Sequence, residues 1–164
     1  MKIGIISDTH DSHENVLKAI DLFNDNDVDY VLHAGDIVSP FTAKAFAGLN
    51  ARKFIAVYGN NDGEKMMLKN TITDFGGEIH EYCYKGTLGG KRIYMIHVPF
   101  DIDEVVKSQE YDIVIYGHTH NQDIRQEGKS LVINPGEATD WLTGAGNMVI
   151  LETNDMSYEA LMIK

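Results

Sequence analysis

The side chains best suited to bind a metal ion come directly after short apolar segments of this sequence. In five places an apolar run ends and an Asp, Asn or His follows within a few residues. The seven residues concerned are Asp8, His10, Asp36, Asn60, His97, His118 and His120. Their ligand atoms are oxygen and nitrogen only, which suits Mn²⁺, Fe²⁺, Ni²⁺ or Zn²⁺ better than a soft-metal thiolate site. The residue types therefore indicate a divalent metal site.

The apolar segments that precede these residues are expected to be strands. They span residues 3–6, 31–34, 54–57, 93–96 and 113–116. In sheets built from strand–helix units, the carboxyl ends of parallel strands form one rim, and ligands bind there. We therefore expect five strand ends to bring two Asp, one Asn and four His side chains into a single cluster.

The local spacing of the ligands supports this cluster. Asp8-Thr9-His10 and His118-Thr119-His120 each place two ligands two positions apart. In extended backbone such pairs point the same way, so both side chains of a pair can enter one site. Glycine suits sharp turns where backbone crowds a site. It stands just before the ligand residues at Gly35, Gly59 and Gly117.

The first half of the chain alternates strands and helices, which implies parallel strands with right-handed crossovers. The expected strands are residues 2–7, 29–34 and 53–57, and the expected helices are 13–26, 41–49 and 64–73. In the second half, Gly89-Gly90 signals a hairpin between strands 79–88 and 91–97. A helix over 102–109 and a strand over 112–116 follow, and then come mostly antiparallel strands at 123–126, 131–133, 147–152 and 158–163. This order predicts a mixed α/β fold, with two packed mixed sheets flanked by helices.

Length and charge set the limits on function. The chain has 164 residues, which predicts a single domain over residues 1–164. Its apolar N-terminal stretch is too short for a signal peptide and no run is long enough to span a membrane, so we expect a cytoplasmic protein with no membrane partner. Fourteen basic and 25 acidic residues give a net charge of −11, which argues against nucleic acid as a stable partner. The lone Cys83 forms no internal disulfide and no thiolate zinc site.

Several residues have a structural interpretation as well. Asp62 could cap the next helix, and a lone His97 at a strand end is more often structural than catalytic. We assign Trp141 first to the core, ahead of a substrate platform or a dimer contact. His33 and Cys83 are expected to be packed residues. His13 is placed at an exposed helix start and His80 at a sheet edge. A structural interpretation would have to be right for all seven ligand residues at once, and each of them follows the end of a strand. We therefore favour the metal site.

The five short sequence blocks that contain the ligands resemble, in their order and residue types, those of the calcineurin-like metallophosphoesterase superfamily. The blocks run from Asp8 to His120, and all seven ligand positions of the pattern are filled. The short chain resembles the small single-domain, YfcE-like phosphodiesterases, and Asn134-Pro135-Gly136 resembles a loop common in that subgroup. The resemblance implies a four-layer metallophosphoesterase-like sandwich and a metal-dependent phosphodiesterase, a hydrolase of phosphodiester bonds.

The resemblance also implies a centre with two divalent metal ions, Mn²⁺ ahead of Ni²⁺, Fe²⁺ or Zn²⁺. The first ion would be held by Asp8, His10, Asp36 and His120, and the second by Asp36, Asn60, His97 and His118. Asp36 would then bridge the ions and be a catalytic residue. In such sites the ions lie ~3.5–4 Å apart, and a bridging hydroxide attacks phosphorus. The charges of two divalent ions, two carboxylates and one hydroxide sum to about +1, which favours an anionic phosphodiester despite the acidic chain.

The chain departs from the family pattern in two places. Phosphatase members carry His directly after the metal-binding Asn, where this chain has Asn61. An amide donates a hydrogen bond to a phosphoryl oxygen but is no acid near neutral pH. With Asn61 as the second catalytic residue, we expect weak activity on alkyl monoesters and better activity on diesters with good leaving groups. The family often has Gly after the position of His97, where this chain has Val98-Pro99.

Two alternatives to a small-molecule phosphodiesterase remain open. The first is a protein-interaction scaffold of the same fold with little or no catalysis, although a scaffold has no physical need for a full ligand set. The second is a DNA-processing nuclease, against which the net charge of −11 argues. The expected partner is a small phosphodiester or phosphate-ester substrate. The sequence is also compatible with a homo-oligomer.

Overall fold

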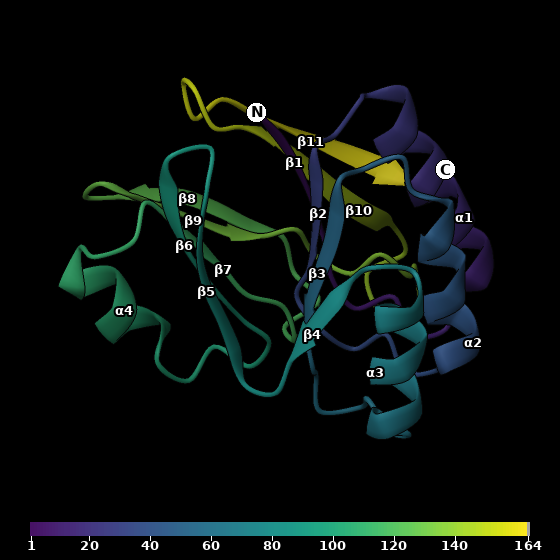
Figure 1. Ribbon diagram of the computed structural model, residues 1–164. Helices are drawn as coiled ribbons and strands as arrows, with labels where there is room; N and C mark the ends of the chain where they lie inside the picture. Colours follow the sequence, from purple (N-terminus) through teal and green to yellow (C-terminus); the bar gives the residue numbers. More distant parts are fainter. Residues whose placement is uncertain (164) are drawn as a thin grey trace.

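The computed structural model describes residues 1–163, which form four layers. Figure 1 shows helices α1 to α3 on one side, two sheets in the middle and helix α4 on the other side. The predicted class, a mixed α/β fold with two packed sheets between helices, is confirmed.

The larger sheet has six strands in the order β11-β10-β1-β2-β3-β4. Its parallel part consists of β1 (Lys2–Ile6), β2 (Tyr30–His33), β3 (Lys53–Val57) and β4 (Glu78–His80). β10 (Gly146–Glu152) pairs antiparallel with β1, and β11 (Tyr158–Ile163) pairs antiparallel with β10. The first three strands are buried for most of their length, as parallel strands covered on both faces require.

The smaller sheet has five strands in the order β5-β6-β7-β9-β8. They are β5 (Cys83–Leu88), β6 (Lys91–Ile96), β7 (Ile113–Ile115), β8 (Asp123–Glu127) and β9 (Ser130–Asn134). β6, β7 and β9 are parallel, and the outer strands β5 and β8 run antiparallel to their neighbours. Gly89-Gly90 closes the β5–β6 hairpin with φ angles of 56° and 76°, so the predicted hairpin turn is confirmed.

Helices cover the outer faces of both sheets. α1 (His13–Asp25), α2 (Pro40–Ala43), the 3₁₀ helix η1 (Lys44–Gly48) and α3 (Lys65–Asp74) cover the larger sheet, and α4 (Ile102–Ser108) covers the smaller one. In α1, the apolar residues at helical spacing are buried against the sheet: Val16, Ala19, Ile20 and Phe23. The inner core between the sheets is aliphatic, for example Ile3 and Leu32 against Ile93 and Ile113.

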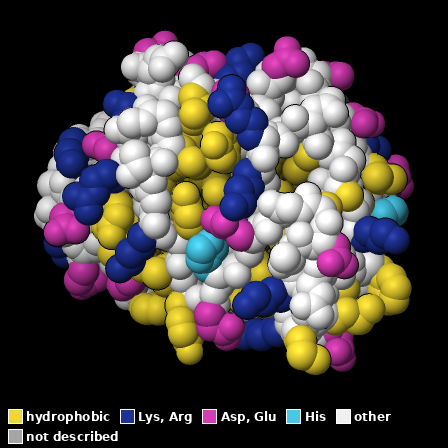
Figure 2. Space-filling view, in the orientation of Figure 1, with side chains coloured by type: hydrophobic (Ala, Val, Ile, Leu, Met, Phe, Trp, Pro, Cys, Tyr) yellow, Lys and Arg dark blue, Asp and Glu magenta, His cyan; other side chains and the backbone are white. Residues whose placement is uncertain are grey.

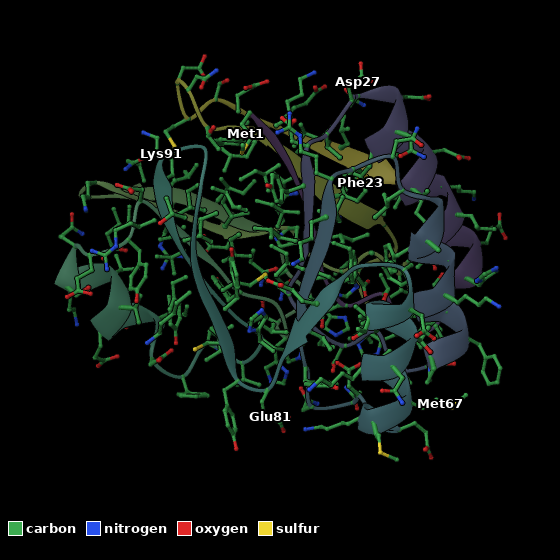
Figure 3. The ribbon with its side chains drawn as sticks, viewed as in Figure 1. Met1, Phe23, Asp27, Met67, Glu81 and Lys91 are labelled. Atoms are coloured by element: carbon green, nitrogen blue, oxygen red, sulfur yellow. The ribbon has the colours of Figure 1, made fainter. Side chains whose placement is uncertain are left out.

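Two predicted elements differ from the structure. The strand expected over 79–88 is broken at Glu81 and Tyr82, because its first part, β4, pairs with the larger sheet and its second part, β5, with the smaller one. Figure 3 labels Glu81 at this crossover. The helix expected over 41–49 begins at Pro40 and is α-helical only to Ala43, after which it tightens into η1. Neither difference changes which strand ends meet.

Within residues 1–163, the helices are too short or too polar to cross a membrane. The surface carries charges of both signs, and Figure 2 shows Lys and Arg side chains interspersed with Asp and Glu over the face in view.

Candidate metal centre

The carboxyl ends of strands from both sheets meet at one rim. Asp8 and His10 follow β1, Asp36 follows β2, and Asn60 follows β3, all in the larger sheet. His97 follows β6, and His118 and His120 follow β7, in the smaller sheet. The interface between the sheets therefore ends in the seven residues that the sequence singled out.

One group of ligand atoms consists of Asp8, His10 and His120. The two imidazole Nε2 atoms lie 3.3 Å apart. His10 Nε2 is 3.7 Å and His120 Nε2 is 3.4 Å from Asp8 Oδ1. Such a set of one carboxylate and two imidazoles suits a divalent transition metal.

A second group consists of Asp8, Asp36 and His97, all three buried. Asp36 Oδ2 lies 3.3 Å from His97 Nε2 and 3.4 Å from His10 Nε2, so this carboxylate stands between the two groups. Asn60 Oδ1 is 3.0 Å from His97 Nε2. The exposed ring of His118 lies farther out, with its centroid 5.3 Å from that of His97.

Asp8 shows that this donor set fits a cation. Its Oδ2 accepts hydrogen bonds from the Ser7 hydroxyl at 2.6 Å and from the His118 backbone N–H at 3.0 Å. Its Oδ1 is buried, accepts no hydrogen bond, and points at the imidazoles of His10 and His120. A buried carboxylate oxygen without a partner is costly, and a metal ion would remove that cost.

The electrostatics around Asp36 keep its carboxylate ionised. Burial alone would raise the pKa of Asp36, but the interaction with His97 and the hydrogen bonds from Asn61 outweigh burial and hold the pKa well below its ordinary value. Burial lowers the pKa of His97, and the Asp36 carboxylate more than restores it, so the net direction is upward. The Asp36 carboxylate at the centre of the site therefore stays ionised.

The backbone at the rim differs from the extended conformation that the sequence predicted. Asp8, His10, His118 and His120 have φ angles of 53°, 39°, 69° and 60°, and Asp36 has 58°. Non-glycine residues rarely adopt this left-handed region, and such strain concentrates at functional sites. The paired ligands do converge, but left-handed turns bring them together.

All three predicted glycines bear directly on the cluster. A Cβ atom on Gly59 would overlap the carboxylate of Asp36, and one on Gly117 would overlap Ser7 Oγ and approach Asp8 Oδ2 to 2.8 Å. Gly35 has a φ angle of 100°, and a Cβ atom there would lie 2.7 Å from His97 Nδ1. The prediction that glycine permits a close approach of backbone to the site is confirmed at all three positions.

Glu137 is a further residue of the site that was not predicted from the sequence. This residue follows the Asn134-Pro135-Gly136 turn and is fully buried. Its Oε2 is 2.7 Å from His120 Nδ1, and its Oε1 accepts hydrogen bonds from the backbone N–H groups of Leu142 and Thr143 at 3.0 and 2.6 Å. The sequence signal that could have identified Glu137 is its position just beyond the end of β9, on the same rim as the ligands.

The role expected for Asp62 as a helix cap is wrong, because Glu64 occupies that position before α3. Asp62 is instead buried and accepts hydrogen bonds from the backbone N–H groups of Gly59, Val38 and Asp36 at 2.6, 2.6 and 3.2 Å. It thus ties the loop after β2 to the loop after β3.

The core assignment of Trp141 is also wrong. Its side chain is 65% exposed, and its ring centroid lies 6.0 Å from that of His10. His33, by contrast, is fully buried as predicted. His13 begins α1 and is exposed, and His80 lies in the edge strand β4, also as predicted.

The fold and the site define a metal-dependent hydrolase of the layered α/β class. The chain belongs to the calcineurin-like phosphoesterase superfamily, whose domain model matches residues 1–156. It is 42% identical over the full length of both chains to phosphodiesterase MJ0936 of Methanocaldococcus jannaschii. A solved structure described as a novel archaeal phosphodiesterase superposes with a TM-score of 0.94, at 42% identity, covering 99% of each chain. Phosphodiesterase YfcE of Escherichia coli is 27% identical over 85% of this chain and 80% of its own. The predicted family and the predicted class of enzyme are confirmed.

Proposed function

We propose that this protein is a phosphodiesterase that uses two divalent metal ions. The observation that carries the proposal is the buried, unpartnered Asp8 Oδ1, set among imidazoles and adjoining the Asp36 carboxylate. The similarity to a full-length relative named a phosphodiesterase supports the choice of diesters as substrates.

The two groups of ligand atoms suggest how the ions would be shared. The first ion would be held by Asp8, His10, Asp36 and His120, and the second by Asp36, Asn60, His97 and His118. Asp36 qualifies as the shared ligand because its Oδ2 lies within 3.4 Å of an imidazole from each group. When bound, divalent ions supply positive charge and activate water for attack on phosphorus. Mn²⁺ is our first choice, ahead of Ni²⁺, Fe²⁺ and Zn²⁺.

Groups that bind the Nδ1 atoms of two proposed ligand histidines orient their imidazole rings. His97 Nδ1 lies 2.7 Å from the backbone carbonyl of Ala34, to which it donates, and this directs Nε2 toward Asp36 and Asn60. The Glu137 carboxylate does the same for His120. Holding the proton on Nδ1 leaves the Nε2 lone pair free for a cation.

Asn61 would act on the phosphate as a hydrogen-bond donor. Its exposed side chain stands at the rim, with Nδ2 2.7 Å from Asp36 Oδ2 and its backbone N–H 2.8 Å from Asp36 Oδ1. Asn61 therefore holds both oxygens of the proposed shared ligand. It cannot protonate a leaving alkoxide, so diesters with stable leaving groups are the expected substrates.

The scaffold alternative gains no support from the rim. A surface that only binds protein would have no use for an unpartnered buried carboxylate or for strained ligand backbone.

The experiment is hydrolysis of bis-p-nitrophenyl phosphate by protein stripped with a chelator and then titrated with Mn²⁺, Ni²⁺ or Zn²⁺. Activity is expected to be absent in the stripped protein and to return with about two equivalents of metal. Parallel reactions with p-nitrophenyl phosphate give the preference for diester over monoester. Full activity in the stripped protein would refute the proposal.

A further inference from the structure

A pocket of about 160 Å³ opens beside the proposed second metal position. Two of its lining residues, Asn60 and His97, are proposed metal ligands, and Tyr82 and Phe100 contribute aromatic rings. The pocket is thus continuous with the metal centre, and its wall includes groups that no step of the proposed hydrolysis uses.

The two aromatic rings are unusually exposed for their type. The side chains of Tyr82 and Phe100 are 79% and 76% accessible, so neither contributes much to the core. Tyr82 lies at the crossover between β4 and β5, next to Glu81, which Figure 3 labels at the lower edge of the molecule. Phe100 follows Val98-Pro99, in a turn in which its backbone N–H donates to the Val98 carbonyl at 2.9 Å. Exposed apolar side chains that line a pocket together mark a binding surface.

We propose that this pocket holds a planar ring carried by one ester group of the phosphodiester substrate. The inference rests on the proposed function, because the phosphate must lie at the metal centre. Asn60 Oδ1 and His97 Nε2 are 3.0 Å apart and belong to both sites, so a ring attached directly to that phosphate reaches Tyr82 and Phe100.

The size of the pocket limits the group. An apolar cavity of about 150 Å³ holds benzene, whereas whole drug-sized ligands need roughly 300–1,000 Å³. A volume of about 160 Å³ therefore suits a single six-membered ring, such as a phenyl or pyrimidine group. It is too small for a complete nucleotide.

The charge of the lining also favours a neutral ring. Glu81 is its acidic residue, and Lys65 Nζ lies 3.3 Å from Glu81 Oε1. No Lys or Arg lines the pocket, so the nearest such cation among these residues to attract a second phosphate is Lys65, which is already paired with Glu81. A ring between aromatic side chains gains stacking or edge contacts instead.

The test compares two diesters, one with phenyl ester groups, either of which can enter the pocket, and one with methyl ester groups. Dissociation constants of diphenyl phosphate and dimethyl phosphate are measured by calorimetry on Mn²⁺-loaded protein. The wild type is expected to bind diphenyl phosphate more tightly. In Phe100→Ala and Tyr82→Ala this advantage is expected to shrink by about 2- to 12-fold in each variant, the range typical of an aromatic pair. Binding of dimethyl phosphate is expected to stay unchanged.

The matched control is Phe41→Ala. Phe41 is 77% exposed but lines a different pocket with Pro40 and Met67, away from the metal ligands. Tyr82→Leu and Phe100→Leu keep apolar bulk and remove only the ring, and thermal melts of all variants confirm folding. An unchanged ratio of the two constants in folded ring-deleted variants would overturn the inference. Failure of the proposed function is distinct: the wild type would then neither bind dimethyl phosphate nor hydrolyse bis-p-nitrophenyl phosphate.

Discussion

The buried Glu137 pairs with His120, with Oε2 of the carboxylate 2.7 Å from Nδ1 of the imidazole. The other oxygen of Glu137 receives the backbone N–H groups of Leu142 and Thr143. One side chain thus fixes the ring of a proposed metal ligand and also the loop beside Trp141. Carboxylates that orient a ligating histidine in this way tune metal affinity in many sites.

Glu137→Ala is expected to weaken Mn²⁺ binding by about 10–100-fold, because the His120 ring loses the partner that sets its tautomer and orientation. Titration calorimetry of the stripped protein measures the affinity. Glu127→Ala removes an equivalent charge from an exposed position in β8 and serves as control. Equal affinities for wild type and Glu137→Ala would contradict this role.

Asp36→Asn is expected to lower kcat for bis-p-nitrophenyl phosphate by more than about 100-fold. This loss is larger than that typical of a residue that only orients a metal ligand. The reason is that Asp36 Oδ2 adjoins both ligand groups, so both proposed ions would lose a charged ligand. Asp155→Asn is the control, since Asp155 is exposed in the β10–β11 turn. A variant that kept most of its activity would rule out Asp36 as the shared ligand.

Asn61→His is expected to raise kcat on alkyl phosphate monoesters relative to bis-p-nitrophenyl phosphate, by roughly 10–100-fold in the ratio. An imidazole at this place can protonate a leaving alkoxide, which the amide cannot. Steady-state rates on matched mono- and diesters give the ratio, and Asn50→His, at an exposed site before β3, controls for the added imidazole. A ratio that does not move would remove the argument for diester preference.

His33 predicts a dependence of stability on pH. Burial lowers the pKa of His33 to about 3 from its ordinary value of 6.5, so the folded protein keeps this imidazole neutral. Its Nδ1 accepts the Gly35 N–H and its Nε2 faces Thr9 Oγ1, which suits the neutral ring. The unfolded chain takes up a proton below pH 6.5, so stability falls as pH drops from 6.5 toward 3, by about 1.4 kcal/mol per pH unit.

Urea unfolding between pH 4.5 and 7.5 measures this slope. In His33→Gln the free energy of unfolding is expected to depend less steeply on pH, by about 1.4 kcal/mol per pH unit, whatever the variant loses in absolute stability. Both proteins are compared without metal, so that the ligand histidines contribute equally. Parallel curves for the two proteins would show that the titration of His33 does not govern the loss.

The strand ends were predictable because each combines a short apolar run with a polar residue and a nearby glycine. That pattern is local, and it needed only the rule that parallel strands present their carboxyl ends together. The change of sheet at Glu81 and Tyr82 was not predictable in this way. Both halves of segment 79–88 favour strand, and only tertiary pairing assigns them to different sheets.

The supporting residues were harder to find than the ligands. Asp62 and Glu137 act through backbone N–H groups whose positions depend on loop geometry. Large aromatic residues are commonly buried, yet Trp141 is exposed, and Glu137 holds the loop beside it at the surface. The sequence pattern predicts that the ligands converge. The turns that orient these ligands depend on long-range contacts.

The seven proposed ligands are divided between the sheets, four on the larger and three on the smaller. Bound ions would therefore brace the sandwich at one end, across a seam that mainly aliphatic side chains fill elsewhere. Sliding of one sheet over the other would stretch every bond to the shared ions. We expect the loaded protein to open as one cooperative body, and the stripped protein to let amide protons of β5 to β9 exchange ahead of those in β1 to β3.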